Sequence, residues 1–294
     1  MKYILKDKWL WIDIDTLFYK TVQDFMDALI PSKKMQHLCI TNGWIMMDDI
    51  KVKRESRLDG KTLQILLYPN TNAYEKVEKD DIDIVYEDEL VLIVNKEKGL
   101  LVHSDDGQIT LNDQVRSHYR HKNYYDLNPI HRLDKETSGL LMYSKSCIFQ
   151  PLLDEYLNQR SIRRTYYAFV KGKMNKGEKL SIDEPIGKDR HTSGKMIVYK
   201  KGQEAHTKVE SLGYKNNVTA LKCTILTGRT HQIRVHLSYM GYPILNDPLY
   251  GVSYPSLSCM GLVAKELVFY HPLKEENMKV SAELSEELKG LMLK

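Results

Sequence analysis

The sequence predicts an α+β fold, because strand-like and helix-like segments mix along the chain without a regular βαβ repeat. Short apolar runs typical of strands occur at residues 90–95, 100–103, 140–145, 165–170 and 221–226. Apolar side chains recur at helical spacing in residues 19–30 and 148–157, and Thr110 is placed to cap a helix that carries Leu111 and Val115.

The N-terminal region is expected to form a small domain of its own. Residues 19–30 predict a helix that stops at Pro31, and residues 58–68 read as a turn followed by a strand. The polar segment 69–81 is typical of a linker. We therefore expect one domain at residues 1–72 and a second at residues 73–294.

Bulk composition limits the function classes. A chain of 294 residues with 42% apolar and 28% charged residues can bury one substantial core. No apolar run is long enough to span a bilayer or to serve as a signal peptide, so we expect a cytoplasmic protein without membrane contact. The four cysteines form no CxxC pair, which argues against a zinc site and a disulfide framework.

Positive charge is more informative in its distribution than in its total of +4. Residues 117–125 read SHYRHKNYY, and residues 156–173 contain five basic side chains and no acid. Such segments can hold phosphates and stack bases, but they are equally typical of solvated basic surfaces.

The segment HRLDKETSG, residues 131–139, contains the carboxylate that we select as the candidate reactive group, Asp134. Its polar content and Gly139 indicate a loop at the end of a strand, where functional side chains often sit on a rigid support. The alternative is an aspartate that only caps a turn or a helix.

The second polar segment spans residues 227–251. Thr230 is expected to cap a helix whose inner face is Ile233, Leu237 and Met240. Arg229 would then lie at the helix N-terminus, where a cation opposes the helix dipole, so an anionic partner is expected. Asp134 would supply that partner, and the arginine would favour its ionised form.

Three histidines in these segments raise the question of a metal site. His231 and His236 are five residues apart, so they do not share a helix face as an i, i+4 ligand pair would. We expect His131, His231 and His236 to be structural, and we expect no metal and no cofactor.

Four ordered blocks resemble the RluA-type pseudouridine synthases, which modify ribosomal and transfer RNA. They are EDELVLIVNKEKGLLVH, HRLDKETSG, RRTYYAFVKG, and GRTHQIRVHL followed by GYPILNDPLYG. The resemblance implies an isomerase with a mixed, mainly antiparallel central sheet flanked by helices. Glu97 replaces the usual proline, and Leu262, Val263 and Ala264 replace a usual Leu-His-Ala, which puts substrate contacts in doubt more than chemistry.

The resemblance also implies roles for individual residues. Asp134 would be the nucleophile or sugar-activating carboxylate, Tyr166 would stack on the uracil, and Arg229 would pair with Asp134, with Arg234 as the next candidate. Further RNA contacts are expected from Arg132, His131, Thr137, Arg164, His231 and Arg234. Without the resemblance, Tyr166 would be read as an ordinary core tyrosine.

More weakly, residues 1–72 resemble the small RNA-binding domain named after ribosomal protein S4, in which Lys33 and Lys34 would contact phosphates. The alternative is an unrelated small α+β domain. The S4-like reading favours ribosomal RNA, 23S rRNA above all, over transfer RNA as the partner. We expect a monomer.

Two rival functions have weaker support in the sequence. An RNA-binding assembly factor that has lost its activity would be free to lose Asp134, Tyr166 or Arg229, yet all three are present. A glycoside hydrolase needs two carboxylates about 5 to 9.5 Å apart, and the signature offers only Asp134 and Glu136.

Overall fold

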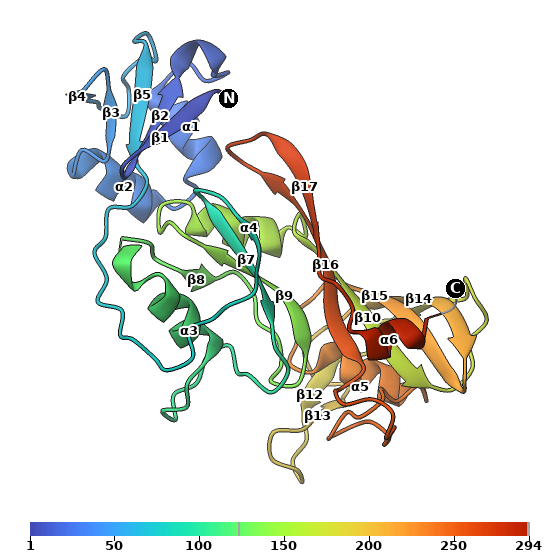
Figure 1. The fold of residues 1–294 in the computed structure, drawn as a ribbon. Helices are drawn as coiled ribbons and strands as arrows, with labels where there is room; N and C mark the ends of the chain where they lie inside the picture. The colour runs from blue at the N-terminus through green and yellow to red at the C-terminus, as the bar shows by residue number, and fades with distance from the viewer. Residues whose placement is uncertain (123, 293–294) are drawn as a thin grey trace.

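The computed structural model describes residues 1–122 and 124–292, and it confirms the α+β fold class. The larger sheet has ten strands in the order β11-β14-β15-β10-β16-β9-β7-β6, with β17 paired to β16 and β8 paired to β9 (Figure 1). Its strands are β6 (Ile84–Glu87), β7 (Val91–Lys96), β8 (Asn128–Pro129), β9 (Ser138–Ser144), β10 (Arg163–Lys171), β11 (Lys179–Ile182), β14 (Thr207–Lys215), β15 (Val218–Ile225), β16 (Leu262–His271) and β17 (Glu276–Ser281).

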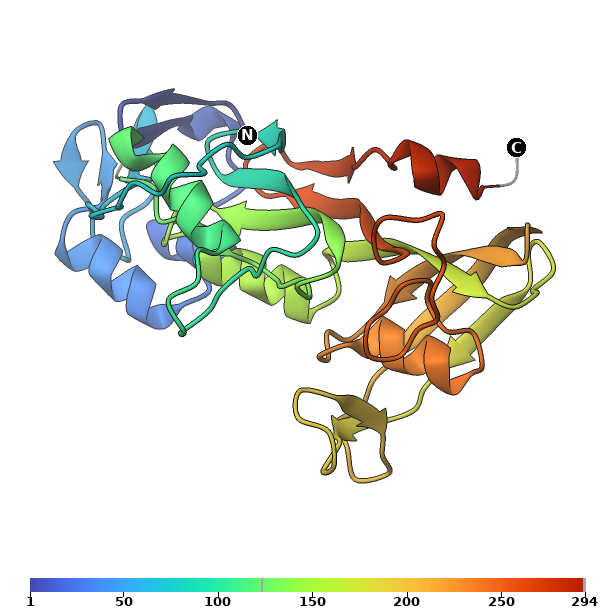
Figure 2. The same cartoon turned by 60° about the horizontal axis from the view of Figure 1, so that its bottom comes forward.

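This sheet is mixed and mainly antiparallel, as expected. Only β9 and β16 pair in parallel among the described strands. The helices around the sheet are α3 (Leu111–His118), α4 (Gln150–Asn158), α5 (Gln232–Tyr239) and α6 (Glu286–Gly290), with a short 3-10 helix η2 (Arg120–Lys122) after α3. A separate hairpin of β12 (Ile186–Lys188) and β13 (Met196–Val198) projects from the body of the molecule (Figure 2).

The N-terminal residues form a five-stranded sheet of their own, in the order β1-β2-β5-β3-β4. Its elements are β1 (Tyr3–Lys6), β2 (Trp9–Asp13), η1 (Ile14–Thr16), α1 (Val22–Leu29), α2 (Lys33–Thr41), β3 (Ile45–Met47), β4 (Ile50–Lys51) and β5 (Thr62–Leu66). In β2, Leu10 and Ile12 are buried with Phe25 and Met26 of α1, whereas the alternate side chains face outward.

Most predicted elements form close to the expected residues, but one does not. Thr110 caps α3 through a capping box with Asp113, as its position suggested. Residues 100–103 are not a strand. The carbonyls of Leu101 and Val102 instead accept the backbone N–H groups of Leu111 and Asn112, so this segment satisfies the first turn of α3.

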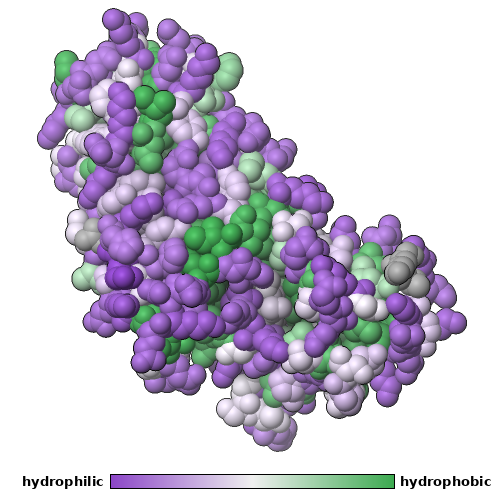
Figure 3. Space-filling view, viewed as in Figure 1, coloured by the Kyte–Doolittle hydropathy of each residue, from purple (hydrophilic) through white to green (hydrophobic). Residues whose placement is uncertain are grey.

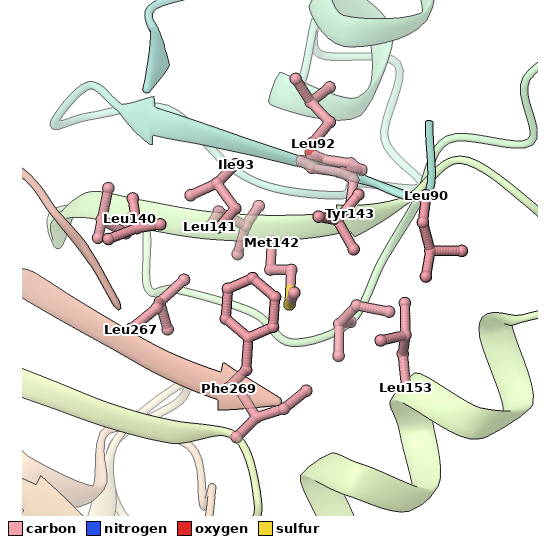
Figure 4. Packing of buried hydrophobic residues seen from close by; sticks show 14 of the residues in the cluster. Leu90, Leu92, Ile93, Leu140, Leu141, Met142, Tyr143, Leu153, Leu267 and Phe269 are labelled. Carbon is pink, nitrogen blue, oxygen red and sulfur yellow. The ribbon is translucent and has the colours of Figure 1, made fainter. Parts of the chain in front are cut away.

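The core beneath the larger sheet is built where β7, β9 and β16 lie side by side. Figure 4 shows Phe269 of β16 against Met142 of β9, with Ile93 of β7 and Leu153 of α4 close by. All four side chains are fully buried. Complete burial of such a side chain contributes roughly 1.5 to 3 kcal/mol, so this packing fixes the strands that carry the candidate site.

Two tyrosines of the segment 117–125 belong to the core and not to an open stacking surface. Tyr119 and Tyr125 are buried, and the Tyr68 and Tyr125 rings lie 4.8 Å apart between centroids. Asn123 lies outside the described residues. For these two tyrosines, the structure contradicts the possibility that they stack on RNA bases.

Hydrophilic residues dominate the face shown in Figure 3, and apolar residues gather in a band over the N-terminal sheet and in another across the middle. In residues 1–122 and 124–292, no helix combines the length and apolar character that crossing a membrane requires.

Candidate active site

The candidate site is built around the loop that leads from β8 into β9. Its turn is closed by the Thr137 N–H, which donates to the Asp134 carbonyl at 3.1 Å. Immediately after the loop, Gly139 adopts φ +109°, and a Cβ there would lie 2.3 Å from the Ala264 carbonyl oxygen. Glycine is therefore required for β9 to approach β16 this closely.

Strand pairing brings this loop next to Tyr166. Ala264 of β16 pairs with Gly139 on one side and with Tyr166 of β10 on the other. The β10–β16 register shifts between Thr165 and Tyr166, and such an irregularity changes the direction of a side chain. The neighbouring strands β9, β16 and β10 thus place the Asp134 loop close to Tyr166.

Asp134 is held by an arginine, but not by the one that the sequence suggested. Arg234 Nη1 lies 3.0 Å from Asp134 Oδ2, and the Asp134 side chain remains 25% exposed. Arg229 instead donates its Nε to the Glu204 carbonyl oxygen at 2.8 Å. The predicted Arg229–Asp134 pair is therefore wrong.

The physical reason is where α5 begins. His231 has a left-handed backbone with φ 56°, and the helix starts at Gln232, so Thr230 does not cap it. The Gln232 side chain accepts the Arg229 backbone N–H at 3.0 Å in place of a cap. Arg229 thus belongs to the preceding turn, whereas Arg234 lies inside the helix.

Arg234 is a buried cation shared by two carboxylates. Its Nε and Nη2 bind the two oxygens of Asp247 at 2.7 and 2.8 Å. The Asp247 side chain is fully buried, and its Oδ1 also accepts the Leu249 N–H. Burial alone would lower the Arg234 pKa, but the hydrogen bonds to Asp247 and the nearby Asp134 outweigh it and raise that pKa.

Asp247 therefore orients Arg234, and Arg234 orients Asp134. Two carboxylates share one guanidinium, which leaves the group with one net negative charge. Arg234 contacts Asp134 through a single oxygen, so the carboxylate stays accessible from solvent. This arrangement can present a positioned carboxylate as a nucleophile.

A buried lysine, Lys96, holds the loop that carries Asp134. Lys96 is 1% exposed, and its ammonium donates to the carbonyls of Glu97, Leu100 and Lys135 at 2.8, 2.8 and 3.0 Å. Burial lowers the Lys96 pKa to about 8, and the charges of Glu136 and Asp134 partly oppose this shift. Lys96 joins the segment after β7 to the Asp134 loop, a role that the sequence reading missed.

Tyr166 and His131 are both buried beside the site. Burial raises the Tyr166 pKa, and the charge of Asp134 adds to the increase. Burial, with a contribution from Arg164, lowers the His131 pKa to about 3. The Met142 N–H points at His131 Nε2 at 3.4 Å, a long contact. Within the described residues, His131 Nδ1 has no hydrogen-bond partner.

The remaining predicted residues fall into three groups. Arg132 is exposed next to the site, and Arg164 is half-buried beside Gly228. Thr137 is buried, so its place suits the loop turn better than RNA contact. His231 Nδ1 lies 2.9 Å from the Tyr250 hydroxyl, and burial lowers the His231 pKa.

Lys33 and Lys34 lie elsewhere, in the first turn of α2. Both are exposed, and Lys33 pairs with Asp27 at 2.6 Å. Across the described residues, the structure holds no group of three His, Cys, Asp or Glu side chains arranged to bind a metal ion.

Comparison with known proteins places this geometry in a family. A sequence model of the family described as RNA pseudouridylate synthase matches residues 90–239. The chain is 33% identical over 263 residues to the uncharacterised RNA pseudouridine synthase YhcT of Bacillus subtilis, which covers 86% of this chain and 87% of that protein. It is 32% identical over 273 residues to ribosomal large subunit pseudouridine synthase D of Xanthomonas campestris, with 86% and 81% covered.

Among solved structures, human RNA pseudouridylate synthase domain containing 1 shares the fold. The TM-score is 0.59 at 23% identity, and the match covers 74% of this chain and 90% of that one. Fold and sequence together define the class as an isomerase that acts on RNA. The chain belongs to the RluA-type RNA pseudouridylate synthase family, and it is an RNA pseudouridine synthase.

Proposed function

We propose that this enzyme converts specific uridines of structured RNA, foremost 23S ribosomal RNA, to pseudouridine, with Asp134 as the reactive carboxylate. The observation that carries the proposal is the Asp134–Arg234–Asp247 group, in which a buried guanidinium positions a carboxylate that solvent can reach. Ribosomal RNA is favoured because ribosomal large subunit pseudouridine synthase D of three bacteria is among the chain's relatives.

The reaction breaks the bond from uracil N1 to ribose C1′, turns the detached base and rejoins it through C5. It needs a positioned carboxylate and a site that retains the free uracil. Asp134 could attack C1′, remove the C2′ proton or add to C6 of the base, and its place in the loop is compatible with each route. In none of these does the chain need to supply an oxidant or a reductant.

Tyr166 would form the floor on which the uracil stacks. Because burial and the Asp134 charge raise its pKa, the phenol keeps its proton in the free enzyme at neutral pH. This favours a stacking contact over a role as a phenolate base. Arg132 is exposed beside Asp134, where it could fill the space left by the flipped uridine, and flipping costs a few kcal/mol.

A glycoside hydrolase remains poorly supported. Such enzymes pair two carboxylates about 5 to 9.5 Å apart, and both must reach the substrate. Asp247 is the second carboxylate of this group, but its side chain is fully buried and both of its oxygens bind Arg234. It is therefore committed to holding the arginine.

We also propose that residues 1–72 form an S4-like RNA-binding domain and residues 73–294 the catalytic domain. Support comes from the separate N-terminal sheet and from the exposed Lys33 and Lys34. We propose that the protein acts as a monomer, and support comes from the Asp134 group, whose three side chains all belong to one chain.

The test is to sequence RNA from cells that lack the protein after a pseudouridine-specific chemical treatment. Cells supplied with wild type or with Asp134→Asn serve as the two controls. We expect signals in 23S rRNA that only the wild-type protein restores. Signals lost from transfer RNA alone would contradict the ribosomal target, and signals restored by Asp134→Asn would contradict the catalytic role.

A further inference from the structure

The N-terminal sheet carries an aromatic and basic surface on the side away from its helices. We call this surface the outer face and define it by Lys2, Ile4, Lys6, Trp11, Lys61 and Thr62, which line a shallow hollow of about 390 Å³. We propose that the outer face binds a single-stranded stretch of the substrate RNA next to the modified region, with Trp11 stacking on a base. This rests on the proposed RNA substrate, and it adds a binding surface distinct from Lys33 and Lys34.

The strand register builds this surface. Leu10 and Ile12 of β2 point into the core, so Trp9 and Trp11 point to the opposite side. Trp11 pairs with Ile4 of β1 and with Gln64 of β5, which places a flat ring in the middle of a row of neighbouring side chains.

The surface stays open to solvent in the folded chain. Ile4 is 55% exposed, and Lys6 and Lys61 are also exposed, as is Lys2 just before β1. The Lys6 ammonium lies 4.4 Å from the centre of the Trp11 ring. The Trp11 ring is half-buried, and the Lys6 side chain over it is exposed, so this flexible lysine can move aside for a base and stay close to the adjoining phosphate.

Charge favours RNA over a protein partner. Three lysines line the hollow and only one acid, Asp13. Single-stranded nucleic acid offers phosphates that lysines can bind and bases that can stack on an aromatic side chain. The exposed apolar residues of the edge strand, Ile4 and Leu5, could instead join two copies of the chain, and the experiment separates these cases.

Tryptophan fluorescence reports on this region directly, because all three tryptophans of the chain, Trp9, Trp11 and Trp44, lie within its first 44 residues. The full-length protein is titrated with a 12-nucleotide oligoadenylate, which contains no uridine to react. We expect quenching on binding. Trp11→Ala should weaken binding at least about fivefold, whereas Trp11→Phe, which keeps a stacking ring, should retain most of the affinity.

The three lysines are tested by a combined Lys2→Ala, Lys6→Ala, Lys61→Ala variant. We expect the slope of log affinity against log salt to become shallower by about 0.7 for each phosphate that the protein no longer neutralises. A matched variant, Lys20→Ala, Lys176→Ala, Lys201→Ala, removes the same charge from exposed positions that do not line the hollow and should keep the wild-type slope. If Trp11→Ala does not fold, Trp11→Phe and the lysine variant still decide the question.

Pseudouridine formation at saturating RNA is measured on the same proteins. Product without any quenching, or unchanged affinity in both Trp11→Ala and the lysine variant, would overturn the proposed surface while the enzyme function stands. If quenching depends on Trp11 and the three lysines as expected but wild type forms no product, the proposed function is contradicted and the proposed RNA-binding surface stands. A dimer in sedimentation that Trp11→Ala abolishes would overturn the RNA proposal, because a second copy of the chain would then occupy the face.

Discussion

Arg234 donates to Asp134 from one guanidinium nitrogen at 3.0 Å while its other two nitrogens hold Asp247. The first prediction follows from this sharing. Arg234→Ala leaves two carboxylates without their cation, and breaking a buried ion pair costs roughly 3 to 5 kcal/mol. We expect a loss of that size in urea unfolding, together with a severe loss of single-turnover rate.

Arg229→Ala is the matched control for Arg234→Ala. Arg229 is partly exposed, and its side chain binds one backbone carbonyl, so its removal should change stability by about 0.5 kcal/mol or less. Its single-turnover rate should stay within tenfold of wild type. Equal losses in the two variants would show that Arg234 has no special place in the site.

A second prediction concerns Gly139. A Cβ at this residue would lie 2.3 Å from the Ala264 carbonyl oxygen, and the backbone has φ +109°. Gly139→Ala should therefore cost about 3 kcal/mol or more and disturb the Asp134 loop. Gly177 also has a positive φ, of 82°, but a Cβ there meets no atom within 4 Å, so Gly177→Ala should cost only about 1 kcal/mol. Comparable unfolding midpoints would contradict the close approach of β9 and β16.

A third prediction concerns pH. The His131 pKa is about 3 in the folded chain and near its ordinary value of 6.5 when unfolded, because burial disfavours the charged ring. Between these values the unfolded state binds more protons, so His131 lowers stability as the pH falls, by about 1.4 kcal/mol per pH unit. Urea unfolding of wild type and His131→Gln from pH 6.5 to 4.5 measures the difference in slope.

The range from pH 6.5 to 4.5 lies above the pH at which Asp88 affects stability. Although burial alone would raise the Asp88 pKa, its hydrogen bond with His271 lowers it, so Asp88 loses its stabilising effect only below about pH 4. Parallel slopes for wild type and His131→Gln above pH 4.5 would mean that His131 is not buried in its neutral form.

The fourth prediction concerns the boundary near residue 72. Tyr68 lies before it but packs in the core against Tyr125, and the Leu67 carbonyl accepts the Ser146 hydroxyl at 2.6 Å. A shortened protein that begins at residue 72 lacks both interactions, and removal of a buried aromatic side chain costs roughly 3 to 5 kcal/mol. One that begins at residue 66 should be more stable by a similar amount.

Both shortened proteins should still convert uridine at saturating RNA, with weaker RNA binding than the full chain. Equal thermal stability of the two would show that the contacts of Leu67 and Tyr68 add nothing to the stability of the catalytic domain. A folded but inactive protein beginning at residue 66 would mean that the N-terminal sheet helps to form the active site.

The sequence predicted the α+β class, the capped helix α3 and the loop that carries Asp134, because each depends on local patterns. The predicted partner of Asp134 was wrong because α5 is buried on nearly all sides. Arg234 is among its buried residues, so the spacing of apolar residues did not identify the inner face of this helix. Asp247 was a signal in the sequence that pointed to Arg234, because a buried arginine needs a carboxylate partner.

Lys96 was missed for a related reason. Its position inside an apolar strand pattern gives no sign that three carbonyls from two loops converge on its ammonium. Such convergence depends on β7 and β9 lying side by side, which one chain's pattern does not specify.

Asp134→Asn tests the central claim most directly. The change keeps the shape of the side chain and removes the nucleophile, so folding and RNA affinity should stay near wild type while product formation is abolished. Glu136→Gln, a carboxylate change in the same loop, is the control and should keep its rate within tenfold. Single-turnover pseudouridine formation is measured for all three proteins on the RNA identified by sequencing. No product from Asp134→Asn is the predicted result, and a rate within tenfold of wild type would contradict the account.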